Sequence, residues 1–247
     1  MEITKSNKID LIKEKVTIVP HDNGATYLVG PIRLPVQLEG NTVHFKWYCW
    51  LDVEQSSNSL EEILEKLPES NLASQQQSSV LVYGDFNESE DALIRMHSIC
   101  HTGDIFGSKR CDCGYQLKQS MKMIVEHGSG AVFYLANHEG RGIGLFSKAL
   151  AYLLQEEGLD TVEANEELGF ADDTRSYDEA IRVLKNLRTK PVTVITNNPK
   201  KLSALQNSGA NVLGRVPLWG DISGYNKHYL ETKMEKAGHL KGGYPIE

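Results

Sequence analysis

Short apolar runs, separated by Gly, Pro or Asn, dominate the first third of the chain. Within each run, apolar residues alternate with polar ones or follow one another directly, which is typical of β-strands buried on one or both faces. The pattern predicts strands at residues 25–29, 32–38, 43–50 and 80–83. The first part of the chain is therefore expected to be rich in β-structure.

Residues 55–79 break this pattern with the sequence QSSNSLEEILEKLPESNLASQQQSS. A short amphipathic helix is predicted at 60–67, followed by Ser and Gln with few apolar residues to anchor them. We interpret 55–79 as a flexible insertion and not as a linker between domains. Residues 1–15 are rich in charge and are expected to form a loosely held N-terminal arm.

From residue 95 onward, the apolar spacing alternates between that of a helix and that of a buried strand. Helices are predicted at 117–126, 145–157, 177–187 and 199–207, and strands at 131–135 and 192–196. Glycines after several of these helices and Pro199 at the start of the last one support the boundaries. The sequence thus predicts a mixed α/β (α+β) fold, in which a β-rich N-terminal part is continuous with a strand–helix alternating C-terminal part, as one domain over 16–247.

Composition agrees with an ordinary globular protein, since 40% of the residues are hydrophobic and 24% are charged. No stretch approaches the about 18 consecutive apolar residues that a membrane helix needs, and no apolar segment follows the N-terminal charges as in a secretory signal. We therefore expect a cytoplasmic protein without membrane contact.

The net charge of -7 is unevenly distributed. Residues 1–94 carry 7 Lys or Arg and 15 Asp or Glu, a net of -8, and the remaining 19 and 18 give a net of +1. A basic field over the whole chain, as nucleic-acid binding needs, is absent. The basic residues of the second part fit a small anionic ligand in one pocket instead.

Three of the four cysteines, Cys100, Cys111 and Cys113, lie close together in the sequence. In a reducing compartment such a cluster indicates a metal site or catalysis. Thiolates bind Zn²⁺ tetrahedrally, and three protein ligands leave the fourth position for water, which is the arrangement of a catalytic site. Two alternatives stay open: a structural site completed by Cys49, and buried thiols that bind no metal. Cys49 lies in the apolar run WYCW, where a small buried side chain is the commoner role.

Three polar segments could bind an anion, although each also has an ordinary structural explanation. Residues 138–144 (HEGRGIG) lead from a strand to a helix, where glycines and the helix N-terminus suit an anion, but a tight turn explains them equally well. Residues 196–201 (TNNPKK) offer hydroxyl, amide and ammonium groups, or form a plain helix cap with solvated lysines. Asp173 and Arg175 could act on one ligand as base and phosphate clamp, or form a surface ion pair.

Together these segments resemble the family of GTP cyclohydrolase II, the first enzyme of riboflavin biosynthesis. The similar pieces are RMHSICHTGDIFGSKRCDCGYQL, HEGRGIGL, TVEANEELGF, DTRSY, TNNPKK and GRVPL, between Arg95 and Leu218. The later segment NKHYLETKMEKAGHL is similar as well. The segment VLVYGDF near residue 80 is also similar, but less closely. The resemblance implies a GTP cyclohydrolase II-like fold, a homodimer, GTP as substrate, one Zn²⁺ per subunit and Mg²⁺ with the triphosphate.

The resemblance also implies roles for individual residues. Cys100, Cys111 and Cys113 would bind the zinc. The implied GTP-binding set is Arg95, Met96, His97, Ser98, Ile99, Gln116, Glu139, Gly140, Arg141, Thr161, Thr196 and Lys201. Asp173 would be the proton acceptor, Arg175 the nucleophile on the α-phosphorus, and Tyr152 a group near the reacting ring. Helical spacing alone would make Tyr152 a core aromatic, and a guanidinium that stays protonated fits a phosphate clamp better than a nucleophile.

The reaction that the resemblance implies opens the guanine ring of GTP at C8 with water activated by zinc. It releases formate and diphosphate and leaves a diaminopyrimidine ribosyl phosphate, while Lys201, Arg141 and Mg²⁺ neutralise the triphosphate. Two residues depart from the family: Ile99 replaces its usual Glu, and His138 its common Gln. A paralogue that stops at the formamide intermediate or takes another nucleotide therefore remains an alternative. The third hypothesis is a non-catalytic zinc-binding module, which would have a closed site with four protein ligands.

Overall fold

The computed structural model describes residues 10–54, 59–171 and 173–242. Parts of the predicted arm at 1–15 and of the predicted insertion at 55–79 therefore lie outside the described residues. Residues 10–13 of the arm are helical, and the insertion contains the helix α2 (Leu60–Lys66) and two short 3₁₀ turns, Leu67–Glu69 and Leu72–Ser74. Among the helices of the described segments, none has the length and apolar character needed to cross a bilayer.

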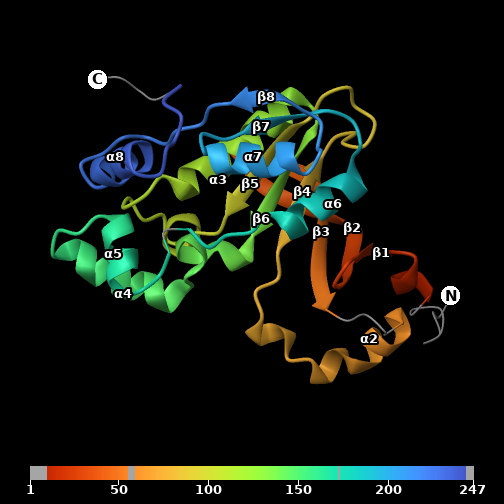
Figure 1. Ribbon diagram of the computed structural model, residues 1–247. Coiled ribbons are helices and arrows are strands. Elements are labelled where there is room, and N and C mark those ends of the chain that lie inside the picture. The colour runs from red at the N-terminus through yellow and green to blue at the C-terminus, as the bar shows by residue number, and fades with distance from the viewer. Residues whose placement is uncertain (1–9, 55–58, 172, 243–247) are drawn as a thin grey trace.

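An eight-stranded mixed sheet runs through the molecule in the order β1–β2–β3–β4–β6–β5–β7–β8 (Figure 1). The strands are β1 (Val16–His21), β2 (Gly24–Leu38), β3 (Asn41–Glu54), β4 (Ser79–Tyr83), β5 (Leu93–Ser98), β6 (Gly130–Leu135), β7 (Val192–Ile195) and β8 (Val212–Val216). Neighbours from β1 to β6 pair antiparallel, whereas β6, β5, β7 and β8 pair in parallel. The predicted mixed α/β fold, with a β-rich part continuous with a strand–helix part, is confirmed.

The helices that follow are α3 (Cys113–His127), α4 (Leu145–Glu156), α5 (Thr161–Glu167), α6 (Asp178–Leu187), α7 (Pro199–Asn207) and α8 (Lys227–Glu235). The helix predicted at 199–207 has these bounds, and those at 60–67, 145–157 and 177–187 each differ by one residue at one end. The helix predicted at 117–126 begins earlier, at Cys113, and extends to His127. Strands β1, β5 and β8 and helices α5 and α8 were not predicted.

Alternate residues of the central strands face two separate hydrophobic cores, as the two-residue period of a strand requires. Val80 and Val82 of β4 and Phe133 of β6 pack with α6 and α7 on one face. Leu81 of β4 and Val132 of β6 pack with α3 on the other face. Since helices cover both faces, the central strands are buried on both sides.

The four parallel strands end at one edge of the sheet. The chain leaves β5 into residues 99–105, β6 into the 3₁₀ segment η4 (Ala136–Gly142), β7 into α7, and β8 into residues 217–220. Helices α4, α5 and α8 gather on this side, away from α2 (Figure 1). Ligands of such sheets bind beyond the carboxyl ends of the parallel strands, so this edge is where a site is expected.

Candidate functional site

The three clustered cysteines converge at the end of β5. Cys100 precedes a single π-helical turn (η3, His101–Ile105), and Cys113 opens α3. Their sulfur atoms all lie within 4.8 Å of one another, and the Sγ atoms of Cys100 and Cys111 are 3.6 Å apart. The edge of a tetrahedron with zinc–sulfur bonds of ~2.3 Å is about 3.8 Å long, so the spacing fits three zinc ligands.

The backbone around these sulfurs leaves room for a metal ion. A Cβ atom at Gly103 would lie 2.9 Å from Cys111 Sγ and 3.1 Å from Cys100 Sγ, so any larger residue would intrude on the cluster. Hydrogen bonds from Cys111 and Cys113, together with the charge of Lys148, hold the pKa of Cys100 well below its usual range. A small space lined by three sulfurs, one of them readily ionised, is chemically suited to a thiophilic cation.

Asp112, between two of the cysteines, ties the cluster to the C-terminal part of the chain. Its carboxylate is buried and accepts hydrogen bonds from Gln116 Nε2 at 2.6 Å, from Gly220 N at 3.3 Å and from Lys233 Nζ of α8 at 2.7 Å. Gly220 lies so close that a Cβ there would come within 2.3 Å of Asp112 Cβ. This carboxylate therefore fixes the cysteine loop against α8 and the segment after β8.

A cavity adjoins the sulfur cluster, and we call it the cysteine cavity. Its walls come from the end of β5, the three cysteines, η4, α4, α5 and α8. Lining residues include Ser98, Ile99, Cys100, Cys111, Cys113, His138, Glu139, Gly140, Arg141, Lys148, Tyr152, Thr161, Asn165, Arg175 and Tyr229. The Tyr152 hydroxyl lies 3.3 Å from Thr102 Oγ1, and its ring packs against the Arg110 guanidinium at 4.1 Å.

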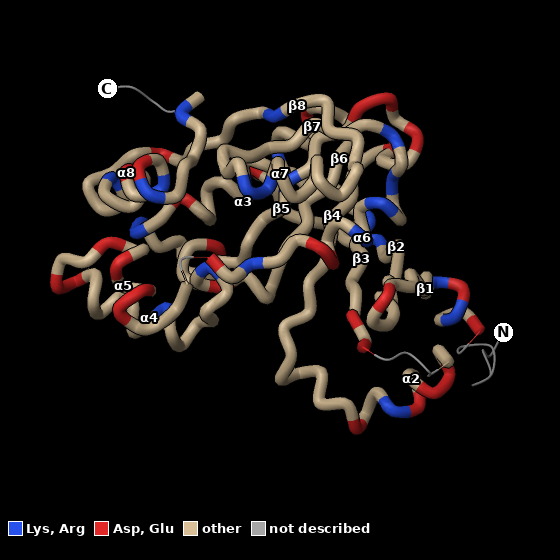
Figure 2. Tube along the Cα trace, viewed as in Figure 1, with Lys and Arg blue, Asp and Glu red and all other residues tan. Residues whose placement is uncertain are grey.

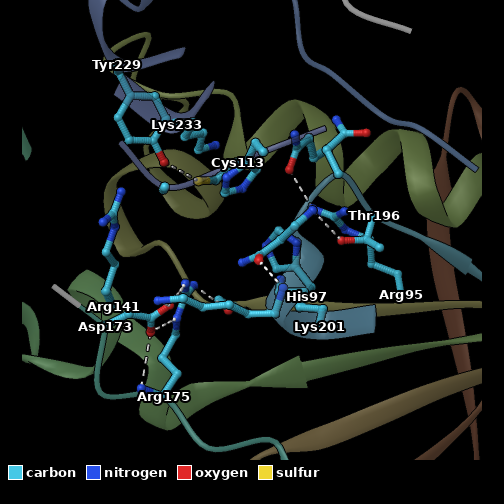
Figure 3. Close-up of a pocket in the computed structure, with 17 residues that line it drawn as sticks. Arg95, His97, Cys113, Arg141, Asp173, Arg175, Thr196, Lys201, Tyr229 and Lys233 are labelled. Carbon is cyan, nitrogen blue, oxygen red and sulfur yellow. Dashed lines mark hydrogen bonds and ion pairs between the residues drawn. The ribbon is translucent and has the colours of Figure 1, made fainter. Parts of the chain in front are cut away.

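Cys113 also lines a second cavity, which we call the basic cavity (Figure 3). Six cationic side chains from β5, η4, the 173–177 loop, α7 and α8 line it: Arg95, Arg141, Arg175, Lys200, Lys201 and Lys233. Figure 2 shows basic positions on α7 and both basic and acidic positions on α8, whereas α5 is acidic. Asp173 is the carboxylate among the described lining residues, so the cavity is suited to a polyanion.

Asp173 and Arg175 form a bidentate ion pair, in which Arg175 lines both cavities and Asp173 lines the basic cavity. Arg175 Nε donates to Asp173 Oδ1 at 2.7 Å and Nη2 donates to Oδ2 at 2.8 Å, while Nη1 lies 3.3 Å from Ser98 Oγ. Burial opposes ionisation of Asp173, but the hydrogen bonds and charge of Arg175 outweigh it and hold the Asp173 pKa well below its usual range. Asp173 is therefore a weak base in this arrangement, and Arg175 is held in one orientation.

Lys201 is a buried cation that reaches the cavity from the first turn of α7. Its side chain follows the N-cap Asn198 and Pro199, and Nζ donates to the Met96 carbonyl at 2.7 Å. Burial lowers the Lys201 pKa well below its usual value, and the charges of Arg95, Arg175 and Lys233 lower it further. An anion in the cavity would favour the charged form of Lys201 and raise this pKa.

The structure brings the sequence-predicted site residues together, with one exception. Those that line the cysteine cavity are Ile99, Cys100, Cys111, Glu139, Gly140, Tyr152 and Thr161; those that line the basic cavity are Arg95, His97, Gln116, Asp173, Thr196 and Lys201; Ser98, Cys113, Arg141 and Arg175 line both. Met96 lines neither, because its side chain is 1% exposed in the core and only its carbonyl oxygen faces the site. Cys49 is not part of the sulfur cluster and donates instead to the Ser78 carbonyl at 3.5 Å.

Several lining residues were missed by the sequence reasoning: Lys148, Asn165, Tyr229, Lys233 and His239. Lys148 lies on an amphipathic helix, where a lysine is expected to face solvent. The last three belong to α8 and the segment after it, whose similarity to the family gave no residue a role. Three side-chain nitrogens of the lining residues are buried without a hydrogen-bond partner: Asn165 Nδ2, His97 Nδ1 and His239 Nδ1. The two cavities therefore retain polar atoms to which a ligand could hydrogen-bond.

His138, which departs from the family's common Gln, is a buried neutral imidazole. Its Nε2 lies 2.8 Å from the Ser176 carbonyl and its Nδ1 lies 3.1 Å from Ser98 Oγ. Burial lowers the His138 pKa to about 4, with the charges of Arg175 and Lys201 contributing. The imidazole therefore stays neutral at pH 7 and bridges the end of β5 to the 173–177 loop.

We expect this histidine to make the protein sensitive to acid. Below pH ~6.5 the unfolded chain gains a proton that the folded protein binds only near its lower pKa, so stability falls as the pH falls. Substituting His138→Gln should remove about 2 kcal/mol of the stability loss between pH 7 and pH 5. Urea unfolding of both proteins at the two pH values tests this, since all other groups titrate alike. An equal loss in both would contradict it.

Curated relatives of this chain are proteins of riboflavin biosynthesis. The chain is 51% identical over 165 residues to the probable bifunctional riboflavin biosynthesis protein RIBA 1, chloroplastic, of Oryza sativa subsp. japonica, covering 67% of this chain and 31% of the relative. It is 50% identical over 160 residues to the riboflavin biosynthesis protein RibBA of Bacillus cereus (strain B4264), covering 65% and 40%. The monofunctional riboflavin biosynthesis protein RIBA 3, chloroplastic, of Arabidopsis thaliana is 49% identical over 160 residues, covering 65% and 31%. The chain thus spans well under half the length of these relatives.

A family model described as GTP cyclohydrolase II matches residues 70–217, which is more than half of the chain. The matched range extends from the residues before β4 to the end of β8 and includes the three cysteines, Asp173–Arg175 and Lys201. Helix α8 lies beyond it. From the match and the shared site, we conclude that the chain belongs to the GTP cyclohydrolase II family.

Proposed function

We propose that this chain hydrolyses GTP, in a zinc-dependent reaction that releases formate and diphosphate and leaves a diaminopyrimidine ribosyl phosphate. One observation carries the proposal: the cysteine cavity and the basic cavity share the wall formed by Ser98, Cys113, Arg141, Arg175 and Tyr229. A nucleotide whose phosphates occupy the basic cavity can therefore extend its base to the three sulfurs. Family membership supports GTP as that nucleotide.

The basic cavity would bind the triphosphate. Arg141, Arg175 and Lys201 line this cavity from three different segments of the protein. Their positive charges would therefore neutralise the triphosphate along its whole length. We propose that Mg²⁺ arrives with the nucleotide, because Asp173, the carboxylate among the described lining residues, already binds Arg175 through both oxygens. Catalysis at the phosphates would rest mainly on positioning and charge.

The cysteine cavity would hold the guanine base. Zinc bound by the three sulfurs would supply a water that is activated for hydrolysis at neutral pH. Tyr152 and Thr161 line the same cavity and would orient the ring. The position of the Tyr152 hydroxyl, near Thr102 beside Cys100, supports a role close to the reacting carbon.

For Asp173 and Arg175, the geometry supports a clamp more than a base and nucleophile. The bidentate pair holds the guanidinium toward both cavities, and the low pKa of Asp173 makes it a poor proton acceptor. We propose that Arg175 binds the phosphate next to the ribose and that Asp173 orients it. This assignment predicts no covalent adduct between Arg175 and the nucleotide.

The test is the incubation of zinc-loaded protein with GTP and Mg²⁺, with formate and diphosphate measured separately and the nucleotide product analysed by mass. Equal amounts of formate and diphosphate support the proposal, and the absence of both contradicts it. Ile99 lines the cysteine cavity without offering a hydrogen-bond acceptor from its side chain. For that reason a formamide product, with diphosphate but no formate, is the second candidate that the mass analysis distinguishes.

We also propose a homodimer. Phe146 and Leu153 of α4 are 78% and 60% exposed, and Phe106 beside the sulfur cluster is 71% exposed. Exposed apolar side chains mark an interface where they form one contiguous patch. Their location supports a subunit contact near the site.

A further inference from the structure

Lys148 is a buried cation that the proposed function does not use. It lies in the first turn of α4, lines the cysteine cavity and is 8% exposed. Transferring an ammonium group from water into such a place is unfavourable unless strong partners compensate. The identity of those partners therefore indicates what the side chain does.

Two anionic partners surround the ammonium group. Nζ lies 2.6 Å from Glu139 Oε1 and 3.2 Å from Cys100 Sγ, and 5.6 Å from the centre of the Tyr152 ring. The other carboxylate oxygen of Glu139 accepts a hydrogen bond of 2.7 Å from the backbone N–H of His101. Lys148 and Glu139 thus hold the first cysteine from two sides, through its sulfur and through the next peptide.

The charge of the cluster explains why a cation is needed there. Three thiolates and one Zn²⁺ ion sum to one negative charge, and Cys100 and Cys111 are buried. A buried anion without a partner is strongly disfavoured. Lys148 is the lysine that the structure, over its described residues, shows in hydrogen-bond contact with one of these three sulfurs.

We propose that Lys148 is a positioning residue for the metal site: its ammonium group donates a hydrogen bond to the Cys100 thiolate, compensates the charge of the metal–thiolate cluster, and fixes Cys100 together with Glu139. The inference rests on the zinc site of the proposed function. A hydrogen bond to a thiolate withdraws electron density from the sulfur, so it leaves the metal a stronger Lewis acid. Glu139 accordingly has a structural task, since both its oxygens are engaged within the protein.

The competing explanation is that Lys148 only neutralises Glu139. A double substitution separates the two. Lys148→Met leaves both Cys100 and Glu139 without their cation, whereas Lys148→Met combined with Glu139→Gln removes the buried carboxylate charge as well. Zinc affinity recovers in the double variant only if Glu139 was the sole partner that mattered.

The experiment measures zinc affinity by chelator competition, and the sulfur-to-metal charge-transfer band of the cobalt-substituted protein. For Lys148→Met we expect an affinity about 10–100-fold lower and a band shifted to lower energy, because the sulfur becomes more electron-rich. Lys148→Arg keeps the charge and a donor and should retain more of the affinity. In the double variant the affinity and the band should remain altered.

Lys122→Met is the matched control, because Lys122 also pairs with a glutamate, Glu39, at 3.0 Å but lies on the surface of α3. It should change neither readout. Unaltered affinity and spectrum in folded Lys148→Met, or recovery of both in the double variant, would overturn the proposal. If Lys148→Met does not fold, the double variant decides alone, because it also lacks the ammonium group: unaltered affinity together with an unshifted band in it overturns the proposal. No readout involves GTP, so failure of the proposed reaction would appear separately, in the product assay of the wild type.

Discussion

Replacing Cys113 with serine is expected to abolish both stoichiometric zinc binding and formate release. Cys113 lines both cavities and contributes one of the three sulfurs that lie within 4.8 Å of one another. Groups that only touch metal ligands change affinity by about 10–100-fold, so losing a ligand itself should cost more than ~100-fold. Zinc content after gel filtration and formate production from GTP measure the two effects.

Cys49→Ser is the matched control. Cys49 donates to the Ser78 carbonyl and is outside the cluster, so its substitution should change neither zinc content nor formate production. One equivalent of zinc retained by Cys113→Ser would contradict a three-sulfur site. Zinc lost from Cys49→Ser would instead favour the four-cysteine module.

Substituting Lys201→Met should weaken nucleotide binding and at the same time stabilise the nucleotide-free protein. Loss of one partner of a buried charge pair costs about 2–5 kcal/mol, so the affinity for a non-hydrolysable GTP analogue should fall at least ~30-fold. In the protein without nucleotide, the Lys201 side chain is 7% exposed and its amino group donates to the Met96 carbonyl. Three other cationic side chains lie nearby. An apolar side chain of similar length avoids that burial, and we expect about 1 kcal/mol of added stability at pH 7.

The pH dependence gives this prediction a definite sign. Because the Lys201 pKa is lowered in the folded protein, the unfolded chain binds more protons, and the wild type gains stability as the pH rises toward ~10.5. The advantage of Lys201→Met should therefore shrink between pH 7 and pH 10 in urea unfolding. Lys200→Met, which alters a more exposed lysine 3.5 Å from Asp173, should weaken binding less and add no stability. A destabilised Lys201→Met protein would contradict our account.

Sequence patterns predicted the helices and strands whose apolar residues are the ones that the fold buries. Helix α7 begins at Pro199 after the N-cap Asn198, and its predicted bounds match. Strand β5 was missed because Arg95 and His97 interrupt its apolar run, and only the fold shows that both are buried, bonded to Gln116 and Asp104. Helix α8 buries only Leu230 and Thr232, so its apolar periodicity is too weak to recognise.

At the site, proximity along the chain was enough to predict that the three cysteines lie together. It was not enough to predict which residues surround them. The cationic side chains of the basic cavity come from segments as far apart as Arg95 and Lys233, and spacing in the sequence does not say that they meet. The family resemblance supplied that information up to Leu218. Lys148 shows the remaining limit, since a lysine on an amphipathic helix gives no sign of burial until its partners Glu139 and Cys100 are seen.

The shared wall between the two cavities bears on inhibitor design. One cavity suits a group that binds soft metals, the other a short polyanion, and Cys113, Arg141 and Arg175 belong to both. Two weak fragments joined by a short linker would each raise the local concentration of the other to about the millimolar range, and the gain in avidity can reach ~10²–10⁴. A tight-binding compound could therefore dispense with the ribose and the purine, and so avoid the many other proteins that recognise GTP by its nucleoside.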